Sequence, residues 1–352
     1  MTYGIKYLLM PESPSIQIFG HGLAGAILAE TLSFAGMRVR VWDDGGVASS
    51  QVAAGMFTPL TGRRMIPSWS LAEALPVLNT FYPALEKICG IRFFFPQSTV
   101  RIFRSQAEVS EWRERGNHEF TSPFVLDHLP FESPWGGCEI KGGGWVDLPV
   151  MLKGLKDVRE QNGEWGTFKS PDLTLWAEGV RASENPLWKD VGWRNAHGDI
   201  LTLKIPGLSG DRIYTFGKFL VPLGHSFFRC GATYAWDLSS PDPRPQGRQE
   251  LEEEIRSVLK LPFEVVDHRA GIRPVAIARV PVAGPHPEKP DHWIFNGFGS
   301  KGVLMAPWMA ERIRDLIQKG KTLPKETQAT RRMIRQRDRE RTKRKNNSPH
   351  IQ

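Results

Sequence analysis

Cysteine is scarce in this chain of 352 residues, which contains only Cys89, Cys138 and Cys230. Their wide spacing excludes a disulfide framework and a cysteine-based metal centre. The nine histidines form no pair at ligand spacing with one another or with a cysteine, so no metal site is expected. No apolar run reaches the roughly 20 residues that a membrane-spanning helix needs. The N-terminal stretch lacks a small-residue cleavage site, so we expect no signal peptide and a cytoplasmic location.

Positive charge is concentrated at the C-terminus. The net charge is +8, yet residues 326–352 hold nine Lys and Arg against three Asp and Glu, which leaves about +2 for the rest of the chain. This segment has few apolar residues to bury, which predicts a flexible basic tail. It is either a solvated terminus or an arm that binds nucleic acid.

The remaining composition is that of an ordinary globular protein, with 40% hydrophobic and 24% charged residues. The length favours two domains. Along the chain, segments of α/β character alternate with short aromatic and β-branched runs typical of antiparallel strands. We therefore expect two interleaved domains.

The stretch "IQIFGHGLAGAILAETL", residues 16–32, contains the pattern G-x-G-x-x-G at Gly20, Gly22 and Gly25. A strand-like run precedes these glycines and a helix-like run follows them, which is the context of a dinucleotide-binding turn. Glycines allow the tight turn and the close approach of a pyrophosphate, and the helix start, with Leu23 and Ala24, offers free N–H groups to it. The alternative is a glycine-rich turn that binds nothing.

An acidic residue follows the second strand-like run, "MRVRVWDD". Asp43 lies 18 residues after Gly25, close to the spacing at which such folds bind a ribose hydroxyl. Asp44 is the second candidate for this role.

Four stretches make the sequence similar to the FAD-dependent D-amino acid oxidase/glycine oxidase (DAO) family, which also includes sarcosine oxidases and a tRNA-modifying flavoenzyme domain. They are the glycine motif with Asp43, "SSQVAAGMFTPLTGRR", "LWAEGVRASENPLW" followed by "HGDIL", and the segment from "GIRPVAIARVPVAGP" to "NGFGSKGVLMAPWMAE". The resemblance covers about residues 15–320. The second stretch, with its form "VAAGMFTPLTGRR", suggests a separate branch of the family.

The resemblance implies an α/β protein in which an FAD-binding Rossmann-like domain with a parallel sheet is interleaved with an antiparallel, β-rich substrate domain. We assign residues 13–90, 141–195 and 268–325 to the FAD-binding domain, residues 91–140 and 196–267 to the substrate-binding domain, and 326–352 to the basic tail. The second glycine cluster, Gly297, Gly299 and Gly302, lies between a strand and a helix start. Two such loops at opposite ends of the chain favour a long cofactor, FAD rather than NAD.

The cofactor-binding residues implied by the resemblance are Gly20, Gly22, Leu23, Ala24, Gly25, Asp43, Asp44, Ser50, Ala54, Gly55, Met56, Ala177, Gly179, Gly299, Ser300, Lys301, Gly302 and Val303. The family's substrate carboxylate pairs with an arginine at the position of Arg273, whose planar fork suits two carboxylate oxygens. Tyr234 and Lys301 complete the expected catalytic group. Phe219 stands where relatives often have tyrosine, and His197 and Asp199 replace Arg/Lys and Gln/Glu.

Three functions remain open at this point. The first is an FAD-dependent oxidase or dehydrogenase that oxidises a C–N bond of a small amine or amino acid by hydride transfer to flavin N5. The second is a flavoenzyme that oxidises a carboxymethylaminomethyl modification on tRNA, with the basic tail contacting RNA. The third is a flavin-binding protein without turnover.

Overall fold

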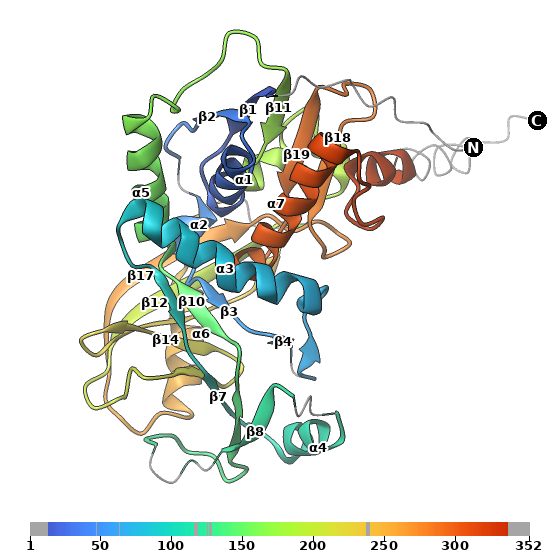
Figure 1. Cartoon of the computed structure of the whole chain (residues 1–352). Helices are drawn as coiled ribbons and strands as arrows, with labels where there is room; N and C mark the ends of the chain where they lie inside the picture. The colour runs from blue at the N-terminus through green and yellow to red at the C-terminus, as the bar shows by residue number, and fades with distance from the viewer. Residues whose placement is uncertain are drawn as a thin grey trace, which may run out of the picture. The chain divides into compact units, whose positions relative to one another are not determined.

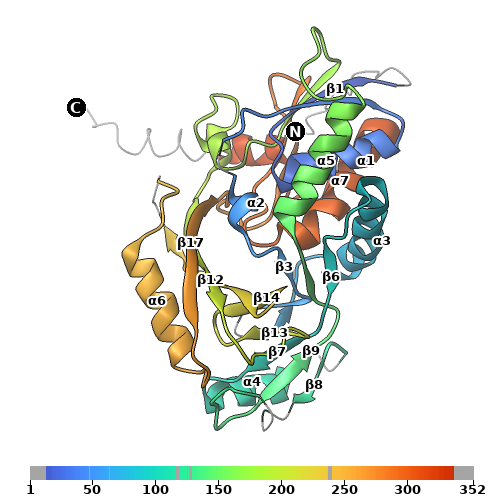
Figure 2. The same ribbon diagram turned by 90° about the vertical axis from the view of Figure 1, so that its left-hand side faces the viewer.

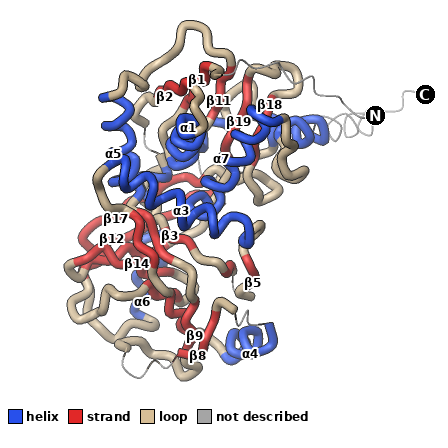
Figure 3. Tube along the Cα trace, in the orientation of Figure 1, coloured by secondary structure: helices blue, strands red, loops and turns tan. Residues whose placement is uncertain are grey.

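The computed structural model describes residues 13–46, 48–62, 64–115, 119–124, 126, 129–236 and 240–336. They divide into two compact units, each built from several stretches of the chain (Figure 1). Unit 1 comprises Met1–Gly46, Lys156–Ala196 and Arg273–Gln352, and unit 2 comprises Val47–Leu155 and His197–Ile272. Helices and strands alternate in unit 1, whereas strands dominate unit 2 (Figure 3). The mixed α/β fold with a parallel and an antiparallel-rich sheet confirms the expected fold class.

Unit 1 is built on a mainly parallel sheet with the strand order β18-β19-β11-β1-β2. Its strands are β1 (Ser15–Phe19), β2 (Arg38–Trp42), β11 (Leu173–Trp176), β18 (Val282–Pro285) and β19 (His292–Asn296). The central strand β1 pairs in parallel with β2 and β11, β11 pairs in parallel with β19, and only β18 is antiparallel to its neighbour. Ile16 and Ile18 alternate along β1 and are fully buried, as the sequence pattern predicts.

The helices α1 (Leu23–Phe34) and α7 (Gly302–Lys319) pack against each other and against this sheet (Figure 1). Unit 1 also contains the short 3₁₀ helices Gly179–Ser183 and Lys189–Val191 and the C-terminal part of α5 (Leu148–Gln161). On α1 the residues Ala26, Ile27, Leu28 and Leu32 are fully buried. These apolar residues hold α1 against the sheet and against α7.

Part of the basic C-terminal segment is folded onto unit 1. Residues 329–336 are helical, and Ala329 and Met333 are fully buried beside Trp188 and Val282. Arg332 donates through Nη2 to the carbonyls of Val280 and Pro281 at 3.0 and 3.1 Å. A flexible tail was expected because apolar residues are few, but two of them, four positions apart, are enough to anchor one helical turn. Residues 337–352 lie outside the described residues.

Unit 2 contains an extended, mostly antiparallel sheet with the order β16-β12-β15-β14-β13-β7-β9-β8, and β17 pairs with β12. Its strands are β7 (Thr99–Ile102), β8 (Thr121–Phe124), β9 (Gly137–Ile140), β12 (Ala196–Lys204), β13 (Ile213–Thr215), β14 (Phe219–Gly224), β15 (Phe227–Gly231), β16 (Ala235–Trp236) and β17 (Glu264–Arg273). A smaller sheet joins β3 (Met56–Phe57), β10 (Gly144–Val146) and β6 (Phe94–Pro96), and β4 (Leu60–Thr61) pairs with β5 (Ile66–Pro67).

The helices of unit 2 are α2 (Ser49–Val52), α3 (Leu71–Cys89), α4 (Gln106–Arg115), α6 (Pro245–Arg256) and the first part of α5. Figure 2 shows α6 lying along β17 and β12. Leu251 and Ile255 on α6 pack against Leu201 and Leu203 of β12 and Phe228 of β15 in one buried cluster. The opposite face of the sheet carries a second apolar cluster, which includes Val221 of β14.

Residues 47–90 and 141–155 fold within unit 2, although the sequence assigns them to the FAD-binding domain. The assignment of the cofactor and the substrate to the two units remains a prediction.

Candidate functional site

The glycine turn after β1 can accommodate only glycine at two positions. A Cβ on Gly20, whose φ is +101°, would lie 2.4 Å from the carbonyl oxygen of Ala177. A Cβ on Gly25 would lie 1.9 Å from the carbonyl oxygen of Gly20. Gly22 is the N-cap of α1, and no side chain caps the helix there. The turn therefore packs closely against the chain's own backbone, and the start of α1, which no side chain caps, fits a pyrophosphate.

The two acidic candidates after β2 have different partners. Asp43 Oδ2 accepts a hydrogen bond from the main-chain N–H of His21 at 2.6 Å, and Oδ1 accepts one from Gly45 N at 2.8 Å. Asp44 instead forms a two-point ion pair with Arg181, in which Nη2 donates to Oδ1 at 2.8 Å and Nη1 to Oδ2. These hydrogen bonds from Arg181 lower the pKa of Asp44 to about 2. Asp43 is thus the acid that is hydrogen-bonded to the glycine turn, while the carboxylate of Asp44 is ion-paired with Arg181.

The carboxyl ends of the other parallel strands lie at the same edge of the sheet. The main-chain N–H of Ala177 bonds to the carbonyl of Phe19 at 2.8 Å, which continues the pairing of β1 with β11. Asn296, at the end of β19, donates to the carbonyl of Gly179 and accepts from Gly297 N, both at 2.8 Å. Ligands of open α/β sheets bind at this edge.

The second glycine cluster lies next to the first. Gly302 begins α7, and a Cβ there would lie 2.6 Å from Leu23 Cδ2 at the start of α1. Gly299, with a φ of +54°, donates its N–H to the carbonyl of Pro274 at 3.0 Å. The starts of α1 and α7 are therefore adjacent within unit 1, although about 280 residues separate them in the sequence.

Lys301 is the N-cap of α7. Burial lowers its pKa from 10.5 to about 8, because water no longer solvates the ammonium group. A cation at the N-terminus of a helix gains nothing from the helix dipole. The position of Lys301 therefore suits an anionic ligand. Ser300 precedes it and Val303, on the first turn of α7, is buried.

In unit 2 the segment Ala53–Met56 is held by backbone contacts with β10. Val146 donates its main-chain N–H to the carbonyl of Gly55 at 3.1 Å, and a Cβ on Gly55 would lie 1.9 Å from the carbonyl of Val146. Ser50 lies on α2, just before this segment. Arg229, on β15, donates from Nη1 to the carbonyl of Ala53 at 3.1 Å. Sequence reasoning missed Arg229 because a single arginine in a strand has no motif around it.

The other catalytic candidates occupy strand ends. Tyr234 precedes β16, is 48% exposed and contacts the edge of the Trp236 ring at a centroid distance of 4.8 Å. Arg273 is the last residue of β17 and is partly buried. The described contacts of unit 1 bring together the residues around Gly20, Asp43 and Gly302, whereas Tyr234 and Met56 belong to unit 2.

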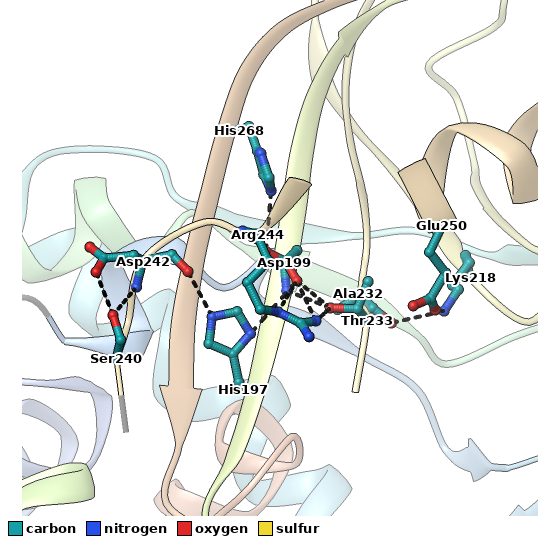
Figure 4. A network of polar contacts seen from close by, with 10 residues as sticks. All are labelled: His197, Asp199, Lys218, Ala232, Thr233, Ser240, Asp242, Arg244, Glu250 and His268. Carbon is teal, nitrogen blue, oxygen red and sulfur yellow. Dashed lines mark hydrogen bonds and ion pairs between the residues drawn. The ribbon is translucent and has the colours of Figure 1, made fainter. Parts of the chain in front are cut away.

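His197 and Asp199, two of the residues that differ from the pattern the sequence resembles, form the centre of a buried polar network in unit 2 (Figure 4). The fully buried Asp199 carboxylate accepts hydrogen bonds from Thr233 Oγ1 at 2.8 Å and from Arg244 Nη2 at 2.8 Å. It also lies 3.2 Å from His268 Nε2. These hydrogen bonds outweigh desolvation, so the pKa of Asp199 is lowered.

Asp199 also caps α6. Arg244 is the N-cap of that helix, and its main-chain N–H donates to Asp199 Oδ1 at 2.9 Å. Gly247, in the first turn, lies so close that a Cβ there would be 2.0 Å from Oδ2. One carboxylate thus anchors both Thr233, next to Tyr234, and the start of α6.

Within the described ranges, no group of three or more His, Cys, Asp or Glu side chains is arranged to hold a metal ion. None of the helices in that part of the chain is long and apolar enough to cross a lipid bilayer.

Comparison with known proteins finds a family match and several relatives. Residues 175–316 match the model of the DAO family, described as FAD dependent oxidoreductase. The chain is 30% identical over 351 residues to the tRNA 5-methylaminomethyl-2-thiouridine biosynthesis bifunctional protein MnmC of Marinobacter nauticus, covering 86% of this chain and 55% of that protein. It is 21% identical to the glycine oxidase of Pseudomonas aeruginosa, covering 87% of this chain and 95% of that enzyme.

A solved structure shares the fold. The glycine oxidase of Geobacillus kaustophilus aligns with a TM-score of 0.72 at 17% identity, covering 88% of this chain and 96% of that one. The chain spans about half the length of the bifunctional tRNA-biosynthesis relatives that it matches. Together these comparisons show that the chain carries an FAD dependent oxidoreductase (DAO) domain match over residues 175–316 and shares the fold of a glycine oxidase.

Proposed function

We propose that the protein oxidises a C–N bond of a small amine or amino acid, with FAD held mainly by unit 1. The observation that carries this proposal is the adjacency of the α1 and α7 starts at Leu23 and Gly302, beside a glycine turn to which Asp43 is bonded. Two helix N-termini at one edge of a parallel sheet provide N–H donors for a long anionic cofactor.

Each part of the cofactor has a fitting group in this unit. The turn from Gly20 to Gly25 would bind the pyrophosphate. Asp43 keeps acceptor capacity for a ribose hydroxyl, since a carboxylate can accept about four hydrogen bonds and two are used. Lys301 and the first N–H groups of α7 would stabilise negative charge on the ring system. Bound FAD supplies a two-electron acceptor for hydride from the carbon that carries the nitrogen.

Arg273, at the end of β17, is proposed to bind the substrate. Arg273 would pair with a substrate carboxylate in a two-point hydrogen bond, which fixes the orientation of the reacting carbon. Tyr234, exposed and next to the anchored Thr233, offers a hydroxyl group. No protein base is required if the amine arrives neutral.

Turnover of the FAD-loaded protein with glycine, sarcosine, proline and D-amino acids tests this proposal. We expect one class to be oxidised, and Arg273→Met to lower kcat/KM at least about 100-fold because a charge-assisted, two-point contact is lost. FAD content should be unchanged in the variant. Bound FAD with no turnover on any amine would contradict the proposal and favour a flavin-binding role without catalysis.

A second candidate is oxidation of a modified base on tRNA. It is favoured by the similarity to tRNA-biosynthesis proteins and by the basic residues Arg337, Arg339, Arg341, Lys343, Arg344 and Lys345. These would contact phosphates without selecting a base.

Truncation after Gln336 tests this candidate while keeping the buried Ala329 and Met333. Loss of activity on tRNA with small-amine turnover intact would support it. Equal activity of the truncated and full chains on tRNA would rule out a role of the basic residues after Gln336 in tRNA binding. No activity of either chain on tRNA would rule out tRNA as the substrate.

A further inference from the structure

We propose that Arg229 and Trp145 form a carboxylate-binding subsite in unit 2, distinct from Arg273, for an organic acid with an apolar body. That this acid is part of the oxidised amine rests on the proposed function. The subsite itself rests on the contacts of the two side chains.

Arg229 projects from the face of the sheet opposite the main core. Its neighbours on β15, Phe228 and Cys230, are buried in the cluster that includes Leu251 of α6, and side chains alternate along a strand. Arg229 therefore shares its face with Val221, its direct partner on β14. This face is the one that adjoins Ala53.

The charge of Arg229 is only weakly compensated, because the carboxylates of Asp147 and Asp267 act on its guanidinium group without forming an ion pair with it. Arg229 donates one hydrogen bond, from Nη1 to the carbonyl of Ala53 at 3.1 Å. Among the described residues no carboxylate forms an ion pair with it. Desolvation lowers its pKa, which shows that the charge is held in a poorly hydrated place. Buried charges are normally paired, so this one is suited to an anionic ligand.

Trp145 provides a second donor without an acceptor. Its side chain is 5% exposed, and Nε1 has no hydrogen-bond partner within the described part of the chain. The ring stacks on Phe95 with centroids 4.5 Å apart. A buried indole N–H usually finds an acceptor, because an unpaired donor loses its hydrogen bond to water on burial. The missing acceptor is expected from a ligand.

The two donors converge on the same segment. Arg229 binds the carbonyl of Ala53, while Trp145 packs in one apolar cluster with Ala54 and Val221. Val221 is the residue opposite Arg229. The cluster is bordered by partly buried apolar side chains, namely Met56, Phe95, Phe219 and Leu223.

This combination selects the ligand by chemistry. A guanidinium fork matches the two oxygens of a carboxylate, and the indole N–H can bond to one of them. The apolar border suits a hydrocarbon or aromatic body rather than a phosphate, which would need more donors. The subsite therefore fits a monocarboxylate such as an aromatic or aliphatic acid.

Calorimetric titration of the FAD-loaded protein with benzoate, and with the neutral benzamide, tests the subsite. We expect Arg229→Met to weaken benzoate binding about 20-fold or more and Trp145→Phe to weaken it about 5- to 10-fold, in line with hydrogen bonds to charged groups. Arg229→Lys, which keeps the charge but not the fork, should fall between wild type and Arg229→Met. Benzamide binding should change less than about 3-fold in Arg229→Met.

Arg256→Met is the matched control, because Arg256 is an exposed arginine on α6 paired with Glu252. It should leave benzoate binding within about 2-fold. Thermal unfolding of each variant shows whether it folds. If Arg229→Met does not fold, Trp145→Phe still tests the subsite, because a phenyl ring can keep the stacking on Phe95.

Unchanged benzoate affinity in both Arg229→Met and Trp145→Phe would overturn the inference. So would loss of binding in Arg273→Met alone, which would place the carboxylate at Arg273 and leave the proposed function intact. Benzoate binding that depends on Arg229 in a protein that oxidises no amine would instead support the subsite and remove the proposed function.

Discussion

The carboxylate of Asp43 accepts a hydrogen bond from the main-chain N–H of His21 at 2.6 Å. This contact joins the acidic residue after β2 to the glycine turn after β1. It also distinguishes Asp43 from Asp44, whose carboxylate is paired with Arg181. The two neighbouring acids should therefore respond differently to the same substitution.

Asp43→Asn should raise the dissociation constant of FAD about 10-fold. The amide oxygen can still accept from His21, but the amide nitrogen cannot accept a ribose hydroxyl, and the lost charged hydrogen bond accounts for about 1.4 kcal/mol. Asp44→Asn is the control and should change the constant less than about 3-fold. Flavin fluorescence during titration of the apoprotein measures both. Equal effects at the two positions would contradict the assignment of the ribose to Asp43.

Gly25→Ala should destabilise the protein by roughly 3 kcal/mol or more. The new Cβ would lie 1.9 Å from the backbone oxygen of Gly20, and backbone at a turn cannot move as a side chain can. Gly210→Ala is the control, since the nearest heavy atom would be 3.5 Å away. Urea unfolding compares the two. A Gly25→Ala protein as stable as Gly210→Ala would show that the turn is looser than described.

Asp199→Asn should lower stability by about 3 kcal/mol at pH 7, because the charged partner of Arg244 and Thr233 is removed from a buried site. The pKa of Asp199 is lowered in the folded state, so its stabilisation is present above the unfolded value of about 3.9 and is lost as the pH falls toward the folded pKa. The difference in free energy of unfolding between wild type and Asp199→Asn should be constant from about pH 7 to 5 and shrink below about pH 4.

The exposed Asp211, bonded to Ser209 and Arg212, is the control for this measurement. Asp211→Asn should change stability by less than about 1 kcal/mol. Urea unfolding at several pH values gives both curves. A difference for Asp199→Asn that grows on acidification would contradict the sign argued above.

Lys301 should produce a falling limb in the pH profile of kcat/KM. Its pKa of about 8 means that the ammonium charge disappears as the pH rises through that value. We expect amine turnover to decrease above about pH 8, the limb to be absent in Lys301→Met, and Lys301→Arg to move it to higher pH. The same limb in Lys301→Met would assign it to another group.

The sequence was sufficient to predict the order strand, glycine turn, helix and acid, because each of these elements is local and has a steric cause. It also predicted the helix that follows the second glycine cluster. Ile16 and Ile18 are buried as their alternation indicates.

Contacts that depend on the packing of distant segments were not predictable. The pairing of Arg181 with Asp44 joins residues 137 positions apart, and a single arginine after a strand carries no signal for it. The docking of Met333 was missed because a charged segment was judged by its average composition. Arg229 and Trp145 became visible only when the structure showed which of their polar atoms have partners.

The absorption spectrum of the purified protein during anaerobic mixing with amines tests the central claim most directly. The account predicts oxidised-flavin bands, in the protein as purified or after addition of FAD, that bleach with an amine carrying a carboxylate. A folded protein that binds no flavin even after reconstitution would contradict the cofactor site built from Gly20, Asp43 and Gly302, and with it the proposed oxidation.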